Sequence, residues 1–96
     1  MSEDVEYIVF DYLVPKLPKV VRRKLGKEKA WGTFNSNNII EIDERLKGKK
    51  ELIIYTHEIL HFIFPNLSEN EIIRSSETLS EFLWKHHYRK VDNDEK

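Results

Sequence analysis

The sequence predicts a small α+β domain in which a sheet of about three strands packs on two long helices, with a short basic helix between strands. Two observations lead to this prediction. Short segments rich in β-branched and aromatic residues, separated by turn residues, fill the first half of the chain. Longer segments with apolar residues at helical spacing fill the second half. A chain of 96 residues has room for a single domain over residues 1–96, with a thin core.

Composition narrows the class of protein. The hydrophobic share of 40% is sufficient for folding, and the absence of cysteine leaves histidine and carboxylate as metal ligands. No apolar run approaches the ~18 residues of a membrane span, and the N-terminus is acidic rather than signal-like. We therefore expect a soluble, cytoplasmic protein without a membrane partner. A formal net charge of −1 gives no strong field for nucleic acid, which we do not expect as a partner.

The first half of the chain reads as strands with one helix. Residues 3–14 alternate moderately and are dominated by β-branched and aromatic side chains, which favours a strand, with a helix as the alternative. Residues 19–25 are predicted to form a short helix, because Pro18 stands at its start and Gly26 just past its end. Residues 16–29 carry seven basic side chains against one acid. Such a run is more often a solvated helix face than a contact for phosphate or an acidic partner.

Two further strands and two helices follow. Residues 31–34 and 39–43 are predicted strands, joined by an asparagine-rich turn whose residues tolerate a left-handed backbone. A helix is expected over about residues 50–64, because Pro65 cannot continue it. Ser68 opens the next helix as part of a capping box with Glu71, and this helix extends to about residue 87. Residues 91–96 are polar and predicted to fray.

The first of these helices contains a metal-binding motif. His57, Glu58 and His61 form His-Glu-x-x-His, in which the two imidazoles lie one turn apart on one face and can reach a single metal ion. Zn²⁺ suits nitrogen ligands, and Glu58 stands where it can take a proton from a zinc-bound water. The alternative is a helix with two satisfied or solvent-facing histidines and a surface glutamate. Apolar residues on both sides favour the metal site, because an active-site helix must be buried.

A catalytic zinc ion needs a third protein ligand. The candidates are Glu69, Glu71 and Glu77. The alternative role for each glutamate is to stabilise the helix dipole or to keep the helix surface soluble. Because the two helices are joined by a short turn, they should run antiparallel, with the start of the second beside His61. On a helical wheel Glu69 falls on the shoulder of the apolar stripe, whereas Glu71 and Glu77 point away. Glu69 is therefore the predicted third ligand. The stripe consists of Ile72, Ser76, Leu79 and Leu83.

With a glutamate helix after the His-Glu-x-x-His helix, the chain resembles gluzincin zinc metallopeptidases, over about residues 31–89. It is similar to their minimal single-domain forms, to small metallopeptidases of phage and prophage genomes, and to antirepressor-type peptidases. The segments that carry the resemblance beside the motif are Ile40-Glu41-Ile42-Asp43, Ser68-Glu69, Glu69-Asn70-Glu71-Ile72 and Leu83-Trp84. The resemblance implies zinc-dependent hydrolysis of a peptide or protein substrate, with His57, His61 and Glu69 on the metal and Glu58 as general base.

The sequence also leads to four further expectations about function. By analogy, the strand over residues 38–43 is expected to pair with an extended peptide substrate. The nominees for stabilising the oxyanion are Tyr55, His86, His87 and Tyr88. The alternative function is a metallopeptidase-like binding module with a structural or inactive zinc site. The presence of Glu58 argues against it, because a structural site needs ligands but no base. Nucleic-acid binding through residues 16–29 ranks last.

Overall fold

The computed structural model describes residues 15–26 and 30–91. The strand predicted at residues 3–14 lies outside the described residues, as do residues 92–96 of the tail. The described elements are strands β1 (Lys19–Arg23), β2 (Gly32–Asn35) and β3 (Ile39–Asp43), followed by helices α1 (Gly48–Ile63) and α2 (Glu69–Lys85). The three strands form one sheet in the order β1-β3-β2. The predicted α+β class, with a small sheet and two long helices, is confirmed.

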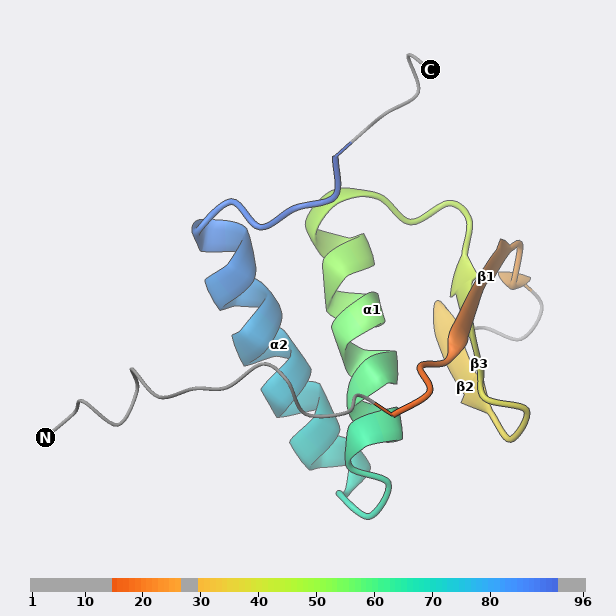
Figure 1. Cartoon of the computed structure of the whole chain (residues 1–96). Helices are drawn as coiled ribbons and strands as arrows, with labels where there is room; N and C mark the ends of the chain where they lie inside the picture. The colour runs from red at the N-terminus through yellow and green to blue at the C-terminus, as the bar shows by residue number, and fades with distance from the viewer. Residues whose placement is uncertain (1–14, 27–29, 92–96) are drawn as a thin grey trace, which may run out of the picture.

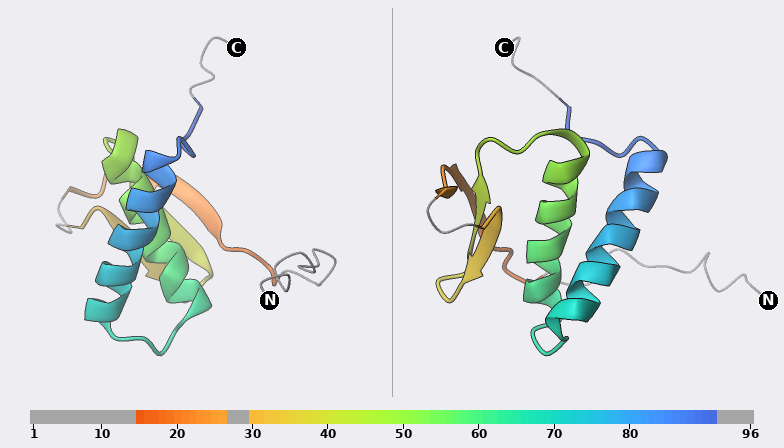
Figure 2. Two further views of the ribbon diagram at one scale, coloured as in Figure 1. Left: turned by 90° about the vertical axis from the view of Figure 1, so that its left-hand side faces the viewer. Right: turned by 180° about the vertical axis from the view of Figure 1, so that it is seen from behind.

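Helix α1 is the middle layer of the molecule. It lies between the sheet on one side and α2 on the other (Figures 1 and 2). A helix covered on two sides must be apolar over most of its surface, and α1 carries apolar residues on several faces. Ile54, Tyr55 and Ile59 of α1 pack against the cluster formed by Ile40, Ile42 and Leu46. The motif helix is thus held from both sides.

The predicted basic helix at residues 19–25 is wrong, because Lys19–Arg23 forms strand β1. This strand pairs in parallel with β3, with Lys19 opposite Ile39 and Arg23 opposite Asp43. The segment is too short to form a stable helix by itself, and its two consecutive valines suit a strand. Pairing with the buried strand β3 outweighs the proline and glycine signals. Its basic side chains are those that commonly protect a sheet edge.

The hairpin of β2 and β3 follows the prediction closely. The strands are antiparallel, and Gly32 lies opposite Ile42. Asn38 adopts a left-handed backbone with φ of 62°, and its N–H donates to the Asn35 carbonyl at 3.1 Å. The side-chain oxygen of Asn35 also accepts from the Asn37 N–H at 2.8 Å. Asparagine therefore supplies both the local hydrogen bond and the backbone conformation that the turn requires.

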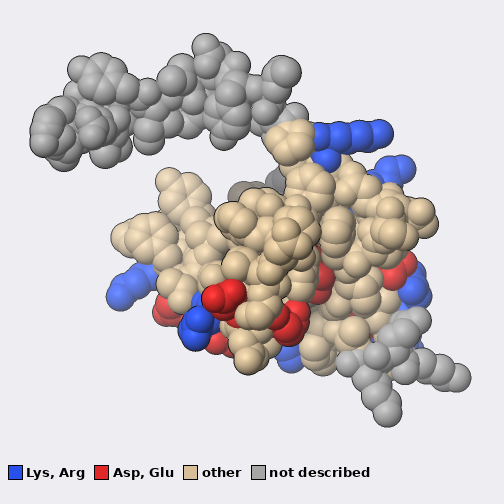
Figure 3. Space-filling model, turned by 90° about the horizontal axis from the view of Figure 1, so that it is seen from below, with Lys and Arg blue, Asp and Glu red and all other residues tan. Residues whose placement is uncertain are grey.

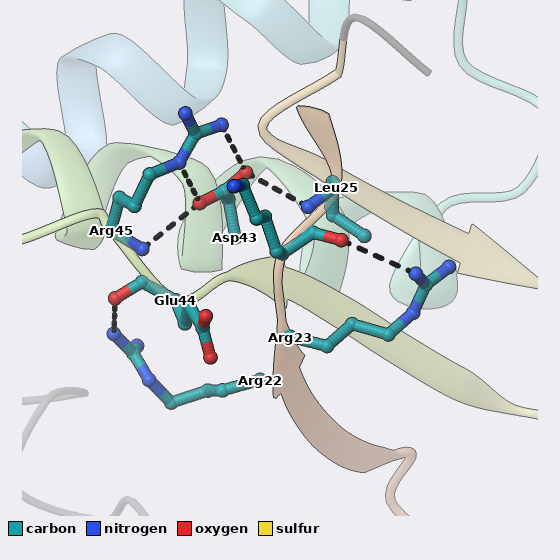
Figure 4. A network of polar contacts seen from close by, with 7 residues as sticks. Arg22, Arg23, Leu25, Asp43, Glu44 and Arg45 are labelled. Atoms are coloured by element: carbon teal, nitrogen blue, oxygen red, sulfur yellow. Dashed lines mark hydrogen bonds and ion pairs between the residues drawn. The ribbon is translucent and has the colours of Figure 1, made fainter. Parts of the chain in front are cut away.

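Asp43, the last residue of β3, forms hydrogen bonds with the segment after β1 and with the connection that leads into α1 (Figure 4). Its buried carboxylate accepts hydrogen bonds from the Leu25 N–H at 3.1 Å and from the Arg45 N–H at 2.9 Å. The Arg45 guanidinium donates two more, at 2.8 and 2.7 Å. These bonds favour the charged carboxylate, so Arg45 foremost holds the pKa of Asp43 well below its usual range. Within the described ranges, no helix has the length and apolar character needed to cross a membrane.

Candidate metal centre

Small hydroxyl residues let the two helices approach closely. Thr56 of α1 and Ser76 and Ser80 of α2 are buried. Each hydroxyl donates to a carbonyl of its own helix, for example from Thr56 to Ile53 at 2.8 Å and from Ser76 to Ile73 at 3.0 Å. Because their hydrogen bonds are satisfied within the helix, these residues can be buried without an unpaired polar group. The close approach brings the start of α2 beside the end of α1.

The turn between the helices sets the level at which α2 begins. Helix α1 ends before Pro65, and the Phe64 N–H donates to the Leu60 carbonyl at 2.8 Å. Ser68 is the N-cap of α2, and its hydroxyl accepts a hydrogen bond from the Glu71 N–H at 3.1 Å. The predicted N-cap is therefore confirmed. Glu69 becomes the first residue of α2, directly across from the last turns of α1.

Three predicted ligands converge at this junction. The Nε2 atoms of His57 and His61 lie 3.3 Å apart. Each also approaches a different carboxylate oxygen of Glu69, Oε2 at 3.1 Å for His57 and Oε1 at 3.0 Å for His61. Two ligands bound to tetrahedral zinc at 2.0–2.1 Å lie about 3.3–3.4 Å from each other. The two nitrogens thus have nearly the spacing found on zinc, and one ligand atom from each of the three residues lies within 4.8 Å of the others. This geometry does not specify zinc among divalent metals.

Glu58 lies on the same stretch of helix but in a different environment. It is buried, whereas the Glu69 side chain is 59% exposed. Burial, together with the nearby charge of Glu69, raises the pKa of Glu58 to about 7. A cation bound at the histidines would oppose this shift by favouring the charged carboxylate. The group is therefore a glutamate kept largely out of water beside the ligand cluster.

Gly32 of β2 allows the sheet to approach Glu58. A Cβ atom at this position would lie 2.6 Å from Cγ2 of Ile54 and 3.2 Å from Oε2 of Glu58. Any side chain here would force the sheet and α1 apart, because contacts below 3.0 Å are repulsive. The absence of a side chain at Gly32 is thus what permits β2 to form a wall beside Glu58.

These residues line one cleft of about 440 Å³. Its lining combines the ligand cluster and Glu58 with parts of β2 and the interhelical turn, namely Gly32, Phe34, His57, Glu58, His61, Pro65 and Glu69. Seen from the end that carries this turn, the surface is mostly uncharged, with acidic atoms near its centre and most basic ones towards the edge (Figure 3). The cleft is open on the side of Glu69 and closed on the side of Glu58.

Other sequence candidates stand apart from this cleft. Neither Glu71 nor Glu77 belongs to the group of ligand atoms around His57 and His61, nor does either line the cleft. None of the four oxyanion nominees lines it either. Tyr55 lines a different cavity, and residues 86–88 follow the far end of α2. Gly32 and Phe34 were missed by sequence reasoning. The glycine inside a predicted strand was the available signal, because such a glycine often marks a close approach.

The expected peptide-binding strand was also misplaced. Strand β3 is the central strand of the sheet and is paired with β1 on one side and β2 on the other. Its backbone groups are used within the sheet, so residues 38–43 cannot take up a peptide as an added strand. Strand β2 is an edge in the described part of the chain, and it is the strand that lines the cleft. Comparisons with protein-family models, curated proteins and solved structures gave no match.

Proposed function

We propose that this chain is a zinc-dependent metallopeptidase in which His57, His61 and Glu69 hold the metal and Glu58 is the general base. The observation that carries the proposal is the convergence of the three residues, one ligand atom of each lying within 4.8 Å of the other two, in a cleft that Glu58 also lines. A purely structural metal site has no need of a buried carboxylate beside its ligands. Nor does it need an open cleft.

The chain's own residues account for the proton transfers of the reaction. A zinc ion held by the three ligands supplies a Lewis acid, which polarises the scissile carbonyl and lowers the pKa of a water molecule towards about 7. The Glu58 carboxylate accepts the proton of the attacking water and later donates it to the leaving amine. Gly32 and the buried surroundings of Glu58 keep other water away from this carboxylate.

The substrate would lie along β2. An extended peptide can add to the outer edge of Gly32–Asn35, so that main-chain hydrogen bonds hold it and its scissile bond lies at the cleft. Phe34 and Pro65 give the cleft an apolar part that suits an apolar substrate side chain. This arrangement replaces the pairing with residues 38–43 that the sequence led us to expect.

The test combines metal analysis with a peptidase assay. Protein purified without added metal and then equilibrated with zinc should bind about one zinc per chain and hydrolyse casein or members of a peptide library. Glu58→Gln should keep the zinc and lose about 10²–10⁴-fold of the hydrolysis, because it removes the base and keeps the shape. Glu77→Gln, which removes a charge outside the cleft, is the matched control. Activity that survived Glu58→Gln would contradict the mechanism, and zinc binding without any hydrolysis would favour a binding module.

A further inference from the structure

A second and larger cavity lies at the opposite end of the helix pair. Its volume is about 770 Å³, within the range of pockets for small organic ligands. Its lining residues come from β1, from the start of α1, and from the end of α2 and the segment after it. The apolar part of its lining consists of Leu46, Leu52, Tyr55 and Trp84. Two aromatic rings and two leucines suit a ligand with a flat apolar body.

The charged part of the lining is strongly basic. Among the described residues, the charged lining consists of four cations, Arg22, Lys47, Arg89 and Lys90, and one carboxylate, Glu51. Glu51 is buried and already paired, because it binds Arg22 and lies 3.5 Å from the Lys90 ammonium. One carboxylate cannot neutralise four cations. Within the described part of the chain, the lining therefore carries an excess of positive charge close to its apolar residues.

The backbone at the cavity adds hydrogen-bond donors. Lys47 is the N-cap of α1 and makes no side-chain capping bond, so the first N–H groups of the helix have no side-chain acceptor at that position. The carbonyls at the end of α2 are better satisfied. The His86, His87 and Tyr88 N–H groups and the Arg89 guanidinium all donate to them. The start of α1, which favours an anion, therefore has no side-chain cap, although its first turn contains the paired carboxylate of Glu51. The end of α2, which favours a cation, is largely occupied.

The turn after α2 places the last two cations. His87 has a left-handed backbone with φ of 68°, and the Tyr88 N–H donates to the Leu83 carbonyl at 2.9 Å. This C-terminal cap reverses the chain, so that residues 89 and 90 return over the end of the helix pair. The Arg89 guanidinium stacks on Trp84 at 3.8 Å from the ring centre and donates to the Trp84 carbonyl at 3.0 Å. The cation is held in position by both contacts.

We propose that this cavity binds an organic anion with a flat apolar body, of the class of aromatic carboxylates. The rings and leucines contact the body, while Lys47, Arg89 and the first turn of α1 bind the carboxylate. The cavity shares no lining residue with the metal cleft. The inference therefore stands independently of the peptidase function.

The probe is naphthalene-2-carboxylate, and the signals are the indole N–H resonances of the full chain in proton–nitrogen NMR. Trp84 lines the cavity and Trp31 does not, so the second tryptophan is an internal control. We expect the Trp84 resonance to shift with a dissociation constant of about 1 mM, while Trp31 stays in place. Naphthalene-2-methanol, which lacks the charge, and acetate, which lacks the body, should each bind at least about fivefold more weakly. Raising the salt concentration from low to about 1 M should weaken the binding of naphthalene-2-carboxylate but not that of the neutral alcohol.

Variants distinguish binding by the cavity residues from a general effect of surface charge. Lys47→Gln should weaken the binding of naphthalene-2-carboxylate about three- to tenfold. The Lys47→Gln, Arg89→Gln double variant should weaken it further. Lys85→Gln removes a lysine that does not line the cavity and should change binding less than twofold. The unchanged dispersion of the remaining NMR signals shows that each variant is folded. Equal binding of the neutral alcohol, an unmoved Trp84 resonance at saturating probe, or equal effects of Lys47→Gln and Lys85→Gln would each overturn the proposal.

Discussion

The two ends of the α1–α2 pair differ in the sign of the charge they accommodate. At one end two imidazoles and the Glu69 carboxylate present lone pairs to a common point. At the other, the described lining of a cavity has four cations and one carboxylate. The helices are antiparallel, so each end joins one helix start to one helix end, and the backbone dipoles largely offset. Side chains and caps therefore decide that one end suits a cation and the other an anion.

The comparison also separates two uses of histidine. His57 and His61 lie one turn apart in the middle of a regular helix, where both rings point to one place. His86 and His87 follow the end of α2, where His86 is the C-cap and His87 adopts a left-handed backbone. The first pair brings its ring nitrogens together. The second is placed by the requirements of the chain reversal.

The largest effect is expected from removing the only carboxylate among the three ligands. Glu69→Ala should reduce zinc affinity by at least about 100-fold, because loss of even a residue behind a ligand costs 10–100-fold. Glu71→Ala, two residues along the same turn, should change affinity less than about twofold. A zinc titration with a competing chelator measures both. If Glu71→Ala released zinc and Glu69→Ala retained it, the assignment of the third ligand would be wrong.

A smaller effect is expected from filling the space between β2 and α1. Gly32→Ala places a methyl group against Ile54 and Glu58, and we expect it to lower the free energy of unfolding by about 1–3 kcal/mol. Peptide hydrolysis should fall by on the order of 10²-fold with zinc affinity nearly unchanged, because Glu58 is displaced and the ligands are not.

The matched control for this substitution is Gly26→Ala. The new Cβ atom there would meet nothing closer than the Arg45 guanidinium at 4.0 Å. Urea unfolding and zinc titration of both variants provide the comparison. Equal stability of Gly32→Ala and the wild type would show that the sheet does not need to approach α1 so closely.

The stability of the chain should respond to pH through Asp43, whose carboxylate is bound by Leu25 and Arg45 at the end of β3. Its pKa is lower in the folded chain than the ~3.9 of an unfolded aspartate, so its contribution to stability is complete above that value. It is lost as the pH falls further, towards the folded pKa. The difference in unfolding free energy between wild type and Asp43→Asn should be constant above about pH 5 and shrink below about pH 4. Urea unfolding across this range measures it, and a difference that grew on acidification would refute the assignment.

The smallest change in the free energy of unfolding is expected from substituting His87. Glycine adopts a left-handed backbone without the steric cost that other residues incur, but it loses more entropy on folding. His87→Gly should therefore raise the free energy of unfolding by only about 0.5 kcal/mol. His86→Gly should lower it, since His86 has φ of −97° and needs no glycine. Thermal unfolding distinguishes the two. Destabilisation by His87→Gly would indicate that the imidazole itself stabilises the turn.

The local features of the site were predictable from the sequence. The spacing of His57, Glu58 and His61, the proline that ends α1 and the serine that caps α2 each act over four residues or fewer. The position of Glu69 followed from these and from the short turn. The hairpin was predictable for the same reason, because Asn35 and Asn38 make its turn by themselves.

Tertiary structure decided the rest. Residues 19–23 carry signals for both helix and strand, and only pairing with β3, some twenty residues later, selects the strand. That pairing makes β3 central and leaves β2 as the edge beside the cleft. Gly32 matters because of Ile54 and Glu58, and the basic cavity gathers residues 22, 47, 51, 89 and 90 from across the chain. Contacts between distant residues carry no signature in a local pattern, because their energies exist only once the chain has folded.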